Sequence, residues 1–372
     1  MKNKKKNLSF QNSLPFKQTD SLAYRSLGSI LGTLLSRASG VVRTMIINAT
    51  FGAGLFLDCF NAAFRFPNAL RDLLADGALS SAFVKVYVDS LEYSVERQKE
   101  LTGIILGFFL FVTLSLCCIA AYFSNEIMAY LATPLFQEMG GVEISSSLFK
   151  VLVFFLPFTM VNALFMAILG VRGQTFRAMN GSIFLSIGMI FGALVFAPFL
   201  HSTQGFLHIH GLVVGTMIGV IFQMLYQMYP LTKLGLLSLP NFNVFKWRRS
   251  SALRQVLKLM FPRFIGQGAL TLALAINTYF AISIGSGVLT YIVTAVTIIQ
   301  VPIGLFGVAT GFAAQPELTK AINKKEQNVF SKLLTGSLES SIWLALITSG
   351  GFALFIVPLY CLIFQHGKIT YS

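Results

Sequence analysis

The sequence predicts an all-α protein that crosses a membrane several times, and its composition and long apolar stretches support this prediction. Hydrophobic residues make up 55% of the 372-residue chain and charged residues only 11%, whereas a typical soluble domain carries about 25% charged residues. Mean hydropathy is +0.72. A soluble chain of this length would need far more polar surface to cover its core. The composition also excludes a disordered chain, which requires low hydrophobicity and high charge.

Nine stretches are candidates for membrane spans, because a spanning helix needs about 20 mostly apolar residues. Each is expected to be helical, since lipid cannot satisfy the backbone groups of an open strand. The nine expected spans cover about residues 26–51, 57–88, 101–123, 151–171, 182–200, 212–231, 256–284, 288–312 and 342–364. Between the third and fourth spans, residues 125–147 predict a short interfacial helix and a loop, with the break at Gly140-Gly141.

The distribution of basic residues predicts a cytoplasmic N-terminus. The chain has 28 Lys+Arg and 14 Asp+Glu, a formal net charge of +14. With the N-terminus inside, the expected outer segments contain only Lys150 and Lys368, whereas the inner segments are rich in basic residues. This asymmetry follows the positive-inside rule. Most of the basic excess therefore indicates topology, and no nucleic-acid partner is expected.

Two of the inner segments are distinctive. Residues 1–25 form a basic cytoplasmic leader. Residues 232–255 form a basic interfacial linker that also carries Phe242, Phe245 and Trp247. Basic and aromatic residues together favour a position at the anionic leaflet, so anionic phospholipids are expected partners at the cytoplasmic face.

The first two spans contain charges that should not face lipid. An ionisable group at bilayer depth costs several kcal/mol unless it faces protein or water. The charges in or at the ends of these spans are Arg37, Arg43, Asp58, Arg65, Arg71, Asp72, Asp76 and Lys85. They indicate either an internal ion-pair network or a cationic cavity for a ligand. The surplus of arginine favours the cavity, because guanidinium groups bind diphosphates and carboxylates in a bidentate manner.

Helical spacing predicts how the charges in the second span are arranged. At 100° per residue, Asp58, Arg65 and Asp72 lie on one face, with a kink expected at Pro67. Arg71 points roughly away from this face and is expected to need another partner, for which Arg43 or a ligand is a candidate. Asp72 and Asp76 form a like-charged pair one turn apart, which is unfavourable unless a cation intervenes or one of them is protonated.

A series of short motifs covers the same region. They are Ser36-Arg37, Gly40, Arg43-Thr44, Phe51-Gly52-Ala53-Gly54, Asp58, Pro67-Asn68, Leu70-Arg71-Asp72, Asp76-Gly77-Ala78 and Ala82-Phe83-Val84. In this order and spacing the segment resembles the MurJ (MviN) family of lipid II flippases, in the MOP exporter superfamily. Weaker matches follow in the expected order at residues 276–278, 301–309, 316–318 and 364–370.

The resemblance implies a MOP/MATE-like helix bundle that flips lipid-linked peptidoglycan precursor across the bacterial inner membrane by alternating access. It implies substrate-binding roles for the arginines Arg37, Arg43 and Arg71 and for the acids Asp58 and Asp76. The partners implied are lipid II or a related undecaprenyl-diphosphate lipid, and cell-wall synthesis proteins. No bond is made or broken, so a transporter rather than an enzyme is expected.

The sequence departs from the family pattern at two cavity positions. Thr44 replaces the acid that usually follows the second arginine, and Thr297 stands where the family carries an arginine in the eighth span. We hypothesise that Arg263, in the seventh span, partly replaces this missing cation and binds substrate. The alternatives are a flippase for another polyprenyl-diphosphate glycan, a MATE-like antiporter, and a degenerate, non-transporting scaffold of the cell-wall machinery.

Length is a further departure from the family, whose members have fourteen helices in two similar halves. Residues 26–231 are expected to form a six-helix first lobe, and residues 256–372 a partial second lobe of three helices. The chain is therefore expected to be a fragment, to have its remainder on another chain, or to be a degenerate copy.

No cofactor or metal site is expected. Cys59, Cys117, Cys118 and Cys361 lie in apolar stretches without ligand spacing, which is typical of small buried hydrophobic residues. The outer-loop histidines, such as His208 and His210, are expected to be solvated rather than metal-bound.

Overall fold

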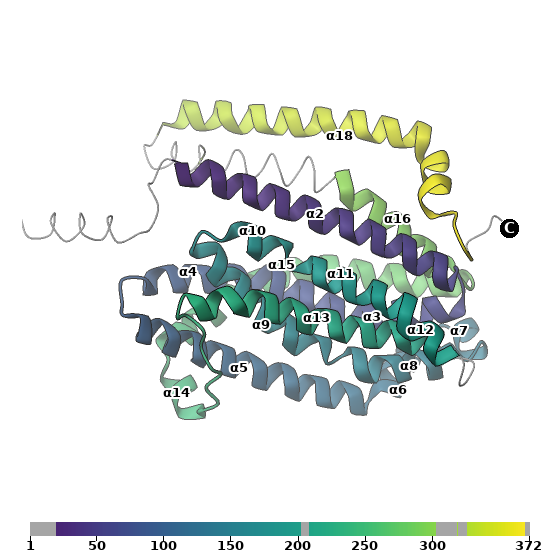
Figure 1. Ribbon diagram of the computed structural model, residues 1–372, viewed down its shortest axis with the longest axis horizontal. Helices are drawn as coiled ribbons and strands as arrows, with labels where there is room; N and C mark the ends of the chain where they lie inside the picture. Colours follow the sequence, from purple (N-terminus) through teal and green to yellow (C-terminus); the bar gives the residue numbers. More distant parts are fainter. Residues whose placement is uncertain (1–19, 202–207, 303–317, 319–325, 369–372) are drawn as a thin grey trace, which may run out of the picture.

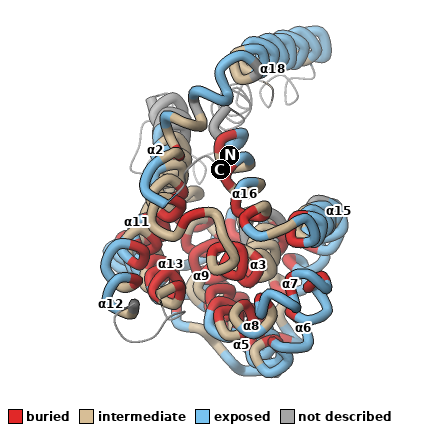
Figure 2. Tube along the Cα trace, turned by 90° about the vertical axis from the view of Figure 1, so that its right-hand side faces the viewer, coloured by how far each residue is buried: buried red, intermediate tan, exposed pale blue. Residues whose placement is uncertain are grey.

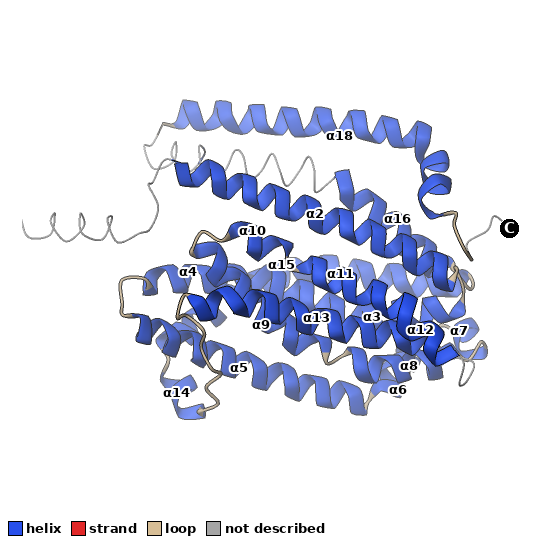
Figure 3. Cartoon of the chain, viewed as in Figure 1, coloured by secondary structure: helices blue, strands red, loops and turns tan. Residues whose placement is uncertain are grey.

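The computed structural model describes residues 20–201, 208–302, 318 and 326–368, and all regular structure in this part of the chain is helical (Figure 3). The first half contains α2 (Asp20–Phe51), α3 (Leu55–Leu70), the π-helix η1 (Arg71–Leu79), α4 (Ser80–Ser90), α5 (Val95–Tyr122), α6 (Ser124–Leu131), α7 (Pro134–Glu138), α8 (Gly141–Leu152) and α9 (Phe155–Val171). The second half contains α10 (Thr175–Asn180), α11 (Ser182–Phe191), the π-helix η2 (Gly192–Phe196), α12 (Ala197–His201), α13 (His208–Lys233), α14 (Val244–Arg249), α15 (Ser251–Ile284), α16 (Val288–Pro302) and α18 (Gln327–Phe364). The predicted all-α fold is confirmed.

Helices lie at all nine expected positions, but they differ in how apolar they are. Within the described residues, four helical stretches are long and apolar enough to cross a membrane: Val95–Tyr122, Gly141–Val171, Thr175–Leu200 and His208–Lys233. Two more qualify if a bent pair counts as one span, because α15 bends by 41° and α18 by 59°. The first two expected spans do not qualify because of their charges, and the eighth continues into residues outside those described. The number nine and the cytoplasmic N-terminus stay predictions.

The segment before the fourth span differs from the expected interfacial loop. Short helices α6 and α7 precede the break at Gly140, but α8 already begins at Gly141 and packs against α3. Ser145 and Ser146 are buried there, which the sequence-based prediction did not anticipate. Their hydroxyls donate to the backbone oxygens of Gly141 (2.6 Å) and Glu143 (3.0 Å). These bonds satisfy the two polar side chains, so a serine-rich turn can lie inside the bundle.

The buried core lies where α3, α8, α9 and α13 meet (Figure 2). Helix α9 is apolar on all sides, as a helix surrounded by other helices must be, and Leu164 and Leu169 are completely buried. Helix α18, in contrast, lies apart from this core, beyond α2 (Figure 1). Most of its side chains are exposed (Figure 2), including Trp343 and Leu354. An apolar helix with this exposure is stable only where lipid or another helix covers it.

Glycines allow α11 and α13 to pack with their backbones in contact. Gly188 and Gly192 on one side face Gly211, Gly215 and Gly219 on the other. A Cβ on Gly215 would lie 2.8 Å from the backbone nitrogen of Gly192, and still closer to the carbonyl oxygen of Gly188. These are backbone atoms that cannot rotate away. Contacts between small residues of this kind replace the hydrophobic effect as the force that joins helices in lipid.

Replacing Gly215 by alanine is therefore expected to lower the stability of the detergent-solubilised protein by about 1–3 kcal/mol, the usual cost of overpacking. Thermal unfolding measures the effect. Gly336→Ala is the matched control, because the space around Gly336 on α18 is open and alanine is the better helix former. Equal melting temperatures for the two variants would contradict the close α11–α13 contact.

A polar joint ties the start of α16 to α2 and α3. The carboxylate of Asp58 is 2% exposed and accepts hydrogen bonds from the backbone nitrogens of Gly287 and Thr290 (2.9 Å) and from the Thr290 hydroxyl (2.6 Å). One turn further along α16, Asn48 Nδ2 donates to Thr294 Oγ1 at 2.7 Å. A carboxylate at a helix N-terminus binds its free N–H groups and complements the helix dipole. Asp58 therefore fixes the position and orientation of α16.

Asp58→Asn and Thr290→Val are each expected to weaken this joint, because hydrogen bonds to a charged group are worth about 1.5–3 kcal/mol. The predicted result is faster hydrogen exchange of the backbone amides in residues 287–294, measured by mass spectrometry. Thr297→Val serves as the control, since within the described residues the Thr297 hydroxyl bonds to Val293 of its own helix and to no other helix. Unchanged exchange in both joint variants would show that α16 is held by other contacts.

Candidate functional site

A cavity of about 520 Å³ lies between α2, α3 with η1, α11 and α16. Its lining is strongly polar although the surrounding helices are apolar. The polar residues that line it are Ser36, Arg37, Arg43, Thr44, Asn48, Asn61, Arg65, Asn68, Arg71, Asp72, Ser182, Ser186, Thr297 and Gln300. Four arginines thus face one aspartate, so the cavity carries a positive charge.

Helix α2 contributes one continuous stripe to the wall. Arg37, Gly40, Arg43 and Thr44 all line the cavity, because residues three and four apart lie on the same face of a helix. The Thr44 hydroxyl bonds to the Gly40 carbonyl of the same helix at 3.0 Å. It therefore needs no partner from the ligand or from α16.

Three of the four cavity arginines have side-chain partners. Arg37 donates to Gln300 on α16, Arg65 Nε donates to Thr278 Oγ1 on α15 at 3.1 Å, and Arg71 pairs with Asp72 at 2.6 Å. Arg43 is different: within the described residues no hydrogen bond or ion pair joins it to another side chain. It also interacts electrostatically with Arg71, a like charge. An unpaired guanidinium at this depth is costly unless an anion or water compensates it.

The π-helical turn η1 explains why Arg71 does not point where the helical wheel predicted. Pro67 removes one backbone N–H from α3, and the wider i→i+5 pattern begins four residues later, at Arg71. In a π-helix the angle per residue is smaller than 100°, so neighbouring side chains lie closer together. Arg71 therefore reaches the carboxylate of Asp72, and both residues line the cavity. The helical wheel did not predict the contact between Arg71 and Asp72, and a ligand contact of Arg71 stays a prediction.

The structure places three of the predicted substrate-binding residues, Arg37, Arg43 and Arg71, on the cavity wall. Asp58 is not among the lining residues, because its carboxylate accepts hydrogen bonds from the N-terminus of α16. Its predicted contact with substrate stays a prediction. Asp76 belongs to η1, and its side chain lies outside the described residues.

The structure does not bring Arg263 to the arginine cavity. It is exposed on α15, as are its neighbours in residues 261–266, and it does not line the cavity. The fourth cation is instead Arg65, which the sequence analysis did not include in the site. The signal was present, since Arg65 lies seven residues from both Asp58 and Asp72 on one helix face. Thr297 does lie on the cavity wall, as its place in the family pattern implied.

The histidines and cysteines offer no metal site within the described residues. Cys59 and Cys117 are buried, as predicted, whereas Cys118 is exposed. The prediction that His208 and His210 lie in a solvated loop was wrong, because α13 begins at His208. The His208 ring packs against Phe51 and Phe56.

Comparison with known proteins agrees with this architecture. The model of the family described as "Lipid II flippase MurJ" matches residues 47–372. The "Probable lipid II flippase MurJ" of Buchnera aphidicola subsp. Acyrthosiphon pisum is 31% identical over 343 residues, which is 91% of this chain and 65% of the relative. The lipid II flippase MurJ of Burkholderia cenocepacia is 26% identical over 347 residues, covering 93% of this chain and 66% of the relative.

Solved structures show the same fold. The structure of lipid II flippase MurJ in an inward closed conformation superimposes with a TM-score of 0.71 at 22% identity, covering 91% of this chain and 68% of that one. A MOP superfamily transporter from Pyrococcus furiosus, titled as having a binding pocket of reverse polarity, gives a TM-score of 0.62 at 16% identity, with 94% and 74% covered. The chain spans about two thirds of the length of these curated relatives. From the match over residues 47–372, the chain belongs to the MurJ family of lipid II flippases.

Proposed function

We propose that this chain moves lipid II, the undecaprenyl-diphosphate-linked peptidoglycan precursor, across the bacterial inner membrane. The observation that carries the proposal is the arginine-lined cavity, in which Arg43 has no protein partner in the described part of the chain. Four arginines and one aspartate give the cavity an excess of positive charge, which the negative charge of a diphosphate would balance. Guanidinium groups bind its oxygens in a bidentate manner.

Arg43 is proposed as the first contact of the diphosphate, because it has no competing hydrogen bond. Arg71 lies near enough to interact with it electrostatically and can exchange its bond to Asp72 for one to the ligand. Arg37 and Arg65 are held by neutral partners, Gln300 and Thr278. Neutral partners leave the full positive charge available to the ligand, unlike an ion pair.

The positive net charge of the cavity distinguishes the proposed lipid flippase from a drug antiporter with the same fold. A cationic drug would require a net acidic cavity, whereas here the excess is cationic. The charged headgroup would occupy the cavity, and the prenyl chain would stay in lipid.

Alternating access supplies the transport step. The joint between Asp58 and the start of α16 links α3 to α16, and both helices line the cavity. We propose that these bonds break when α2 and α3 separate from α16, as in other transporters that rock around a central site. Binding and release of the substrate change no covalent bond, so the chain is proposed to be a transporter and not an enzyme. Cell-wall synthesis proteins are its proposed partners at the membrane.

Arg43→Ala is expected to abolish complementation in a bacterial strain depleted of its own flippase, and to prevent lipid II from becoming accessible outside. Removing an unpaired cavity cation leaves the diphosphate without its first contact. Arg263→Ala, in contrast, is expected to complement fully, because Arg263 lies outside the cavity. Membrane insertion and protein amount are measured for both variants.

Two results would contradict the proposal. If Arg43→Ala complements as well as Arg263→Ala, the cavity does not bind the substrate. If the unmodified chain inserts normally but never makes lipid II accessible outside, the chain is a non-transporting relative that serves as a scaffold.

A further inference from the structure

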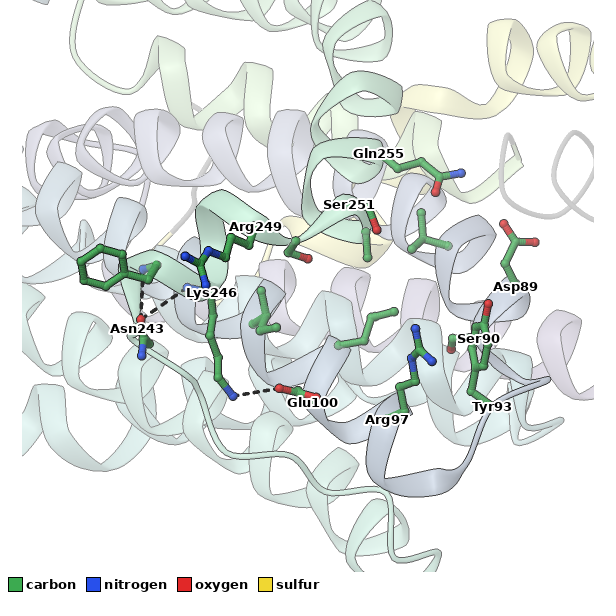
Figure 4. Close-up of a pocket in the computed structure, with 16 residues that line it drawn as sticks. Asp89, Ser90, Tyr93, Arg97, Glu100, Asn243, Lys246, Arg249, Ser251 and Gln255 are labelled. Atoms are coloured by element: carbon green, nitrogen blue, oxygen red, sulfur yellow. Dashed lines mark hydrogen bonds and ion pairs between the residues drawn. The ribbon is translucent and has the colours of Figure 1, made fainter.

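A second cavity, of about 600 Å³, lies far from the arginine cavity, where the α4–α5 turn meets α14 and the start of α15 (Figure 4). Its wall combines three cations, Arg97, Lys246 and Arg249, with two acids, Asp89 and Glu100. The residues come from segments that are distant in the sequence and belong to the first lobe and the linker. Neither the family match nor the transport proposal assigns a role to this cavity.

Of the three cations in this cavity, one forms an ion pair with an acid of the described residues and two do not. Lys246 Nζ lies 2.8 Å from Glu100 Oε1 and neutralises it. The Arg97 guanidinium lies over the Tyr93 ring, 4.3 Å from its centroid, a contact that leaves its charge intact. Arg249 has no acidic partner within 4.0 Å among the described residues. In Figure 4, Asp89 lies on the opposite side of the cavity from Arg249.

The linker is held rigidly enough to form a defined site. Asn241 N donates to the Gly103 carbonyl at 2.8 Å, and Trp247 Nε1 donates to the Asn241 carbonyl at 2.7 Å. The Trp247 ring packs against Phe108 of α5. The linker backbone runs so close to α5 that any side chain at Gly107 would collide with Asn241. Arg249 is therefore placed by the fold and not by a free loop.

The cavity is apolar at one side and borders exposed apolar side chains. Leu101 and Ile104 contribute to its wall, while Leu239, Phe242 and Phe245 of the linker are 83%, 52% and 75% exposed. Large apolar residues beside unpaired cations are typical of segments that lie at the boundary between lipid headgroups and acyl chains. A soluble anion would use the cations but leave these apolar side chains in water.

We propose that this cavity binds the phosphate headgroup of an anionic membrane lipid, with Arg249 and Arg97 as its ligands. The first turn of α15 lines the same cavity through Ser251 and Ala252 and adds the positive end of a long helix. A phospholipid phosphodiester and a polyprenyl diphosphate share this chemistry. The site would anchor the linker between the two lobes to the membrane surface, whether or not the chain transports a substrate.

Brominated lipids test the proposal, because bromine quenches tryptophan and Trp247 lies next to Lys246. The chain has two tryptophans, so a Trp343→Phe background leaves Trp247 as the reporter. The full chain is placed in phosphatidylcholine nanodiscs that contain a minor fraction of brominated phosphatidylglycerol or, in the parallel sample, brominated phosphatidylcholine. Stronger quenching by the phosphatidylglycerol is expected, and Arg249→Gln is expected to weaken its binding about fivefold, which corresponds to about 1 kcal/mol.

Arg248→Gln is the matched control, since Arg248 is the neighbouring residue of α14 but does not line the cavity. It is expected to bind phosphatidylglycerol like the unchanged protein, and Arg249→Lys is expected to retain most of the binding. Equal quenching of all variants by brominated phosphatidylcholine shows that the linker is folded. Two unbrominated competitors, undecaprenyl diphosphate and phosphatidylglycerol, identify which kind of lipid the cavity prefers. If undecaprenyl diphosphate displaces the brominated lipid at the lower concentration, the preferred ligand is a polyprenyl lipid. If phosphatidylglycerol does so, the preferred ligand is a phospholipid.

Three results would overturn the proposal. Equal quenching by the two brominated lipids would show no preference for an anionic headgroup. If Arg248→Gln and Arg249→Gln weaken phosphatidylglycerol binding equally, the lipid is attracted by the surface charge of α14 in general and not by a defined site. Displacement of the lipid by inorganic phosphate alone would show that the cavity binds a soluble anion.

Discussion

The bond between Asp58 and the N-terminus of α16 is the interaction on which the arrangement of the site depends. A buried carboxylate is costly unless its oxygens are hydrogen-bonded, and the first amides of a helix are equally costly unless something accepts from them. Asp58 and α16 satisfy each other across the boundary between α3 and α16. Because Asp58 fixes the start of α16, it also fixes Thr297 and Gln300, which lie two to three turns further along on the cavity wall.

The same boundary explains the charge of the cavity. The α16 residues that line the cavity, Val293, Val296, Thr297 and Gln300, are all uncharged, and the arginines come from α2, α3 and η1. The carboxamide oxygen of Gln300 accepts from Arg37, so it can orient the guanidinium without neutralising it. A carboxylate at position 300 would instead form an ion pair and lower the affinity for an anion. The neutral face of α16 therefore preserves the positive charge that the arginines of α2, α3 and η1 supply.

Much of this arrangement could be predicted from the sequence, and the limits have physical causes. Composition and the long apolar stretches predicted a helical membrane protein, and the surplus of arginine in the first two spans favoured a cationic cavity, which Arg37 and Arg43 do line. The spacing could not place Asp58, because its partner is the end of a helix 229 residues away in the chain. It also misplaced Arg71, since a π-helical turn changes the angle between residues and no composition rule predicts such a turn. The sequence also could not show that Arg263 lies away from this cavity, because a charge in an apolar span need not face the interior; the structure leaves it exposed on α15.

The most direct test of the account is the binding of undecaprenyl diphosphate to the purified chain, compared with the uncharged alcohol undecaprenol. The diphosphate is expected to bind much more tightly than the alcohol, and added salt is expected to weaken only the binding of the diphosphate. Arg43→Gln is expected to lower the affinity for the diphosphate about tenfold or more. Equal affinities for the two lipids, or an unchanged affinity in Arg43→Gln, would contradict the claim that the arginine cavity is a diphosphate site.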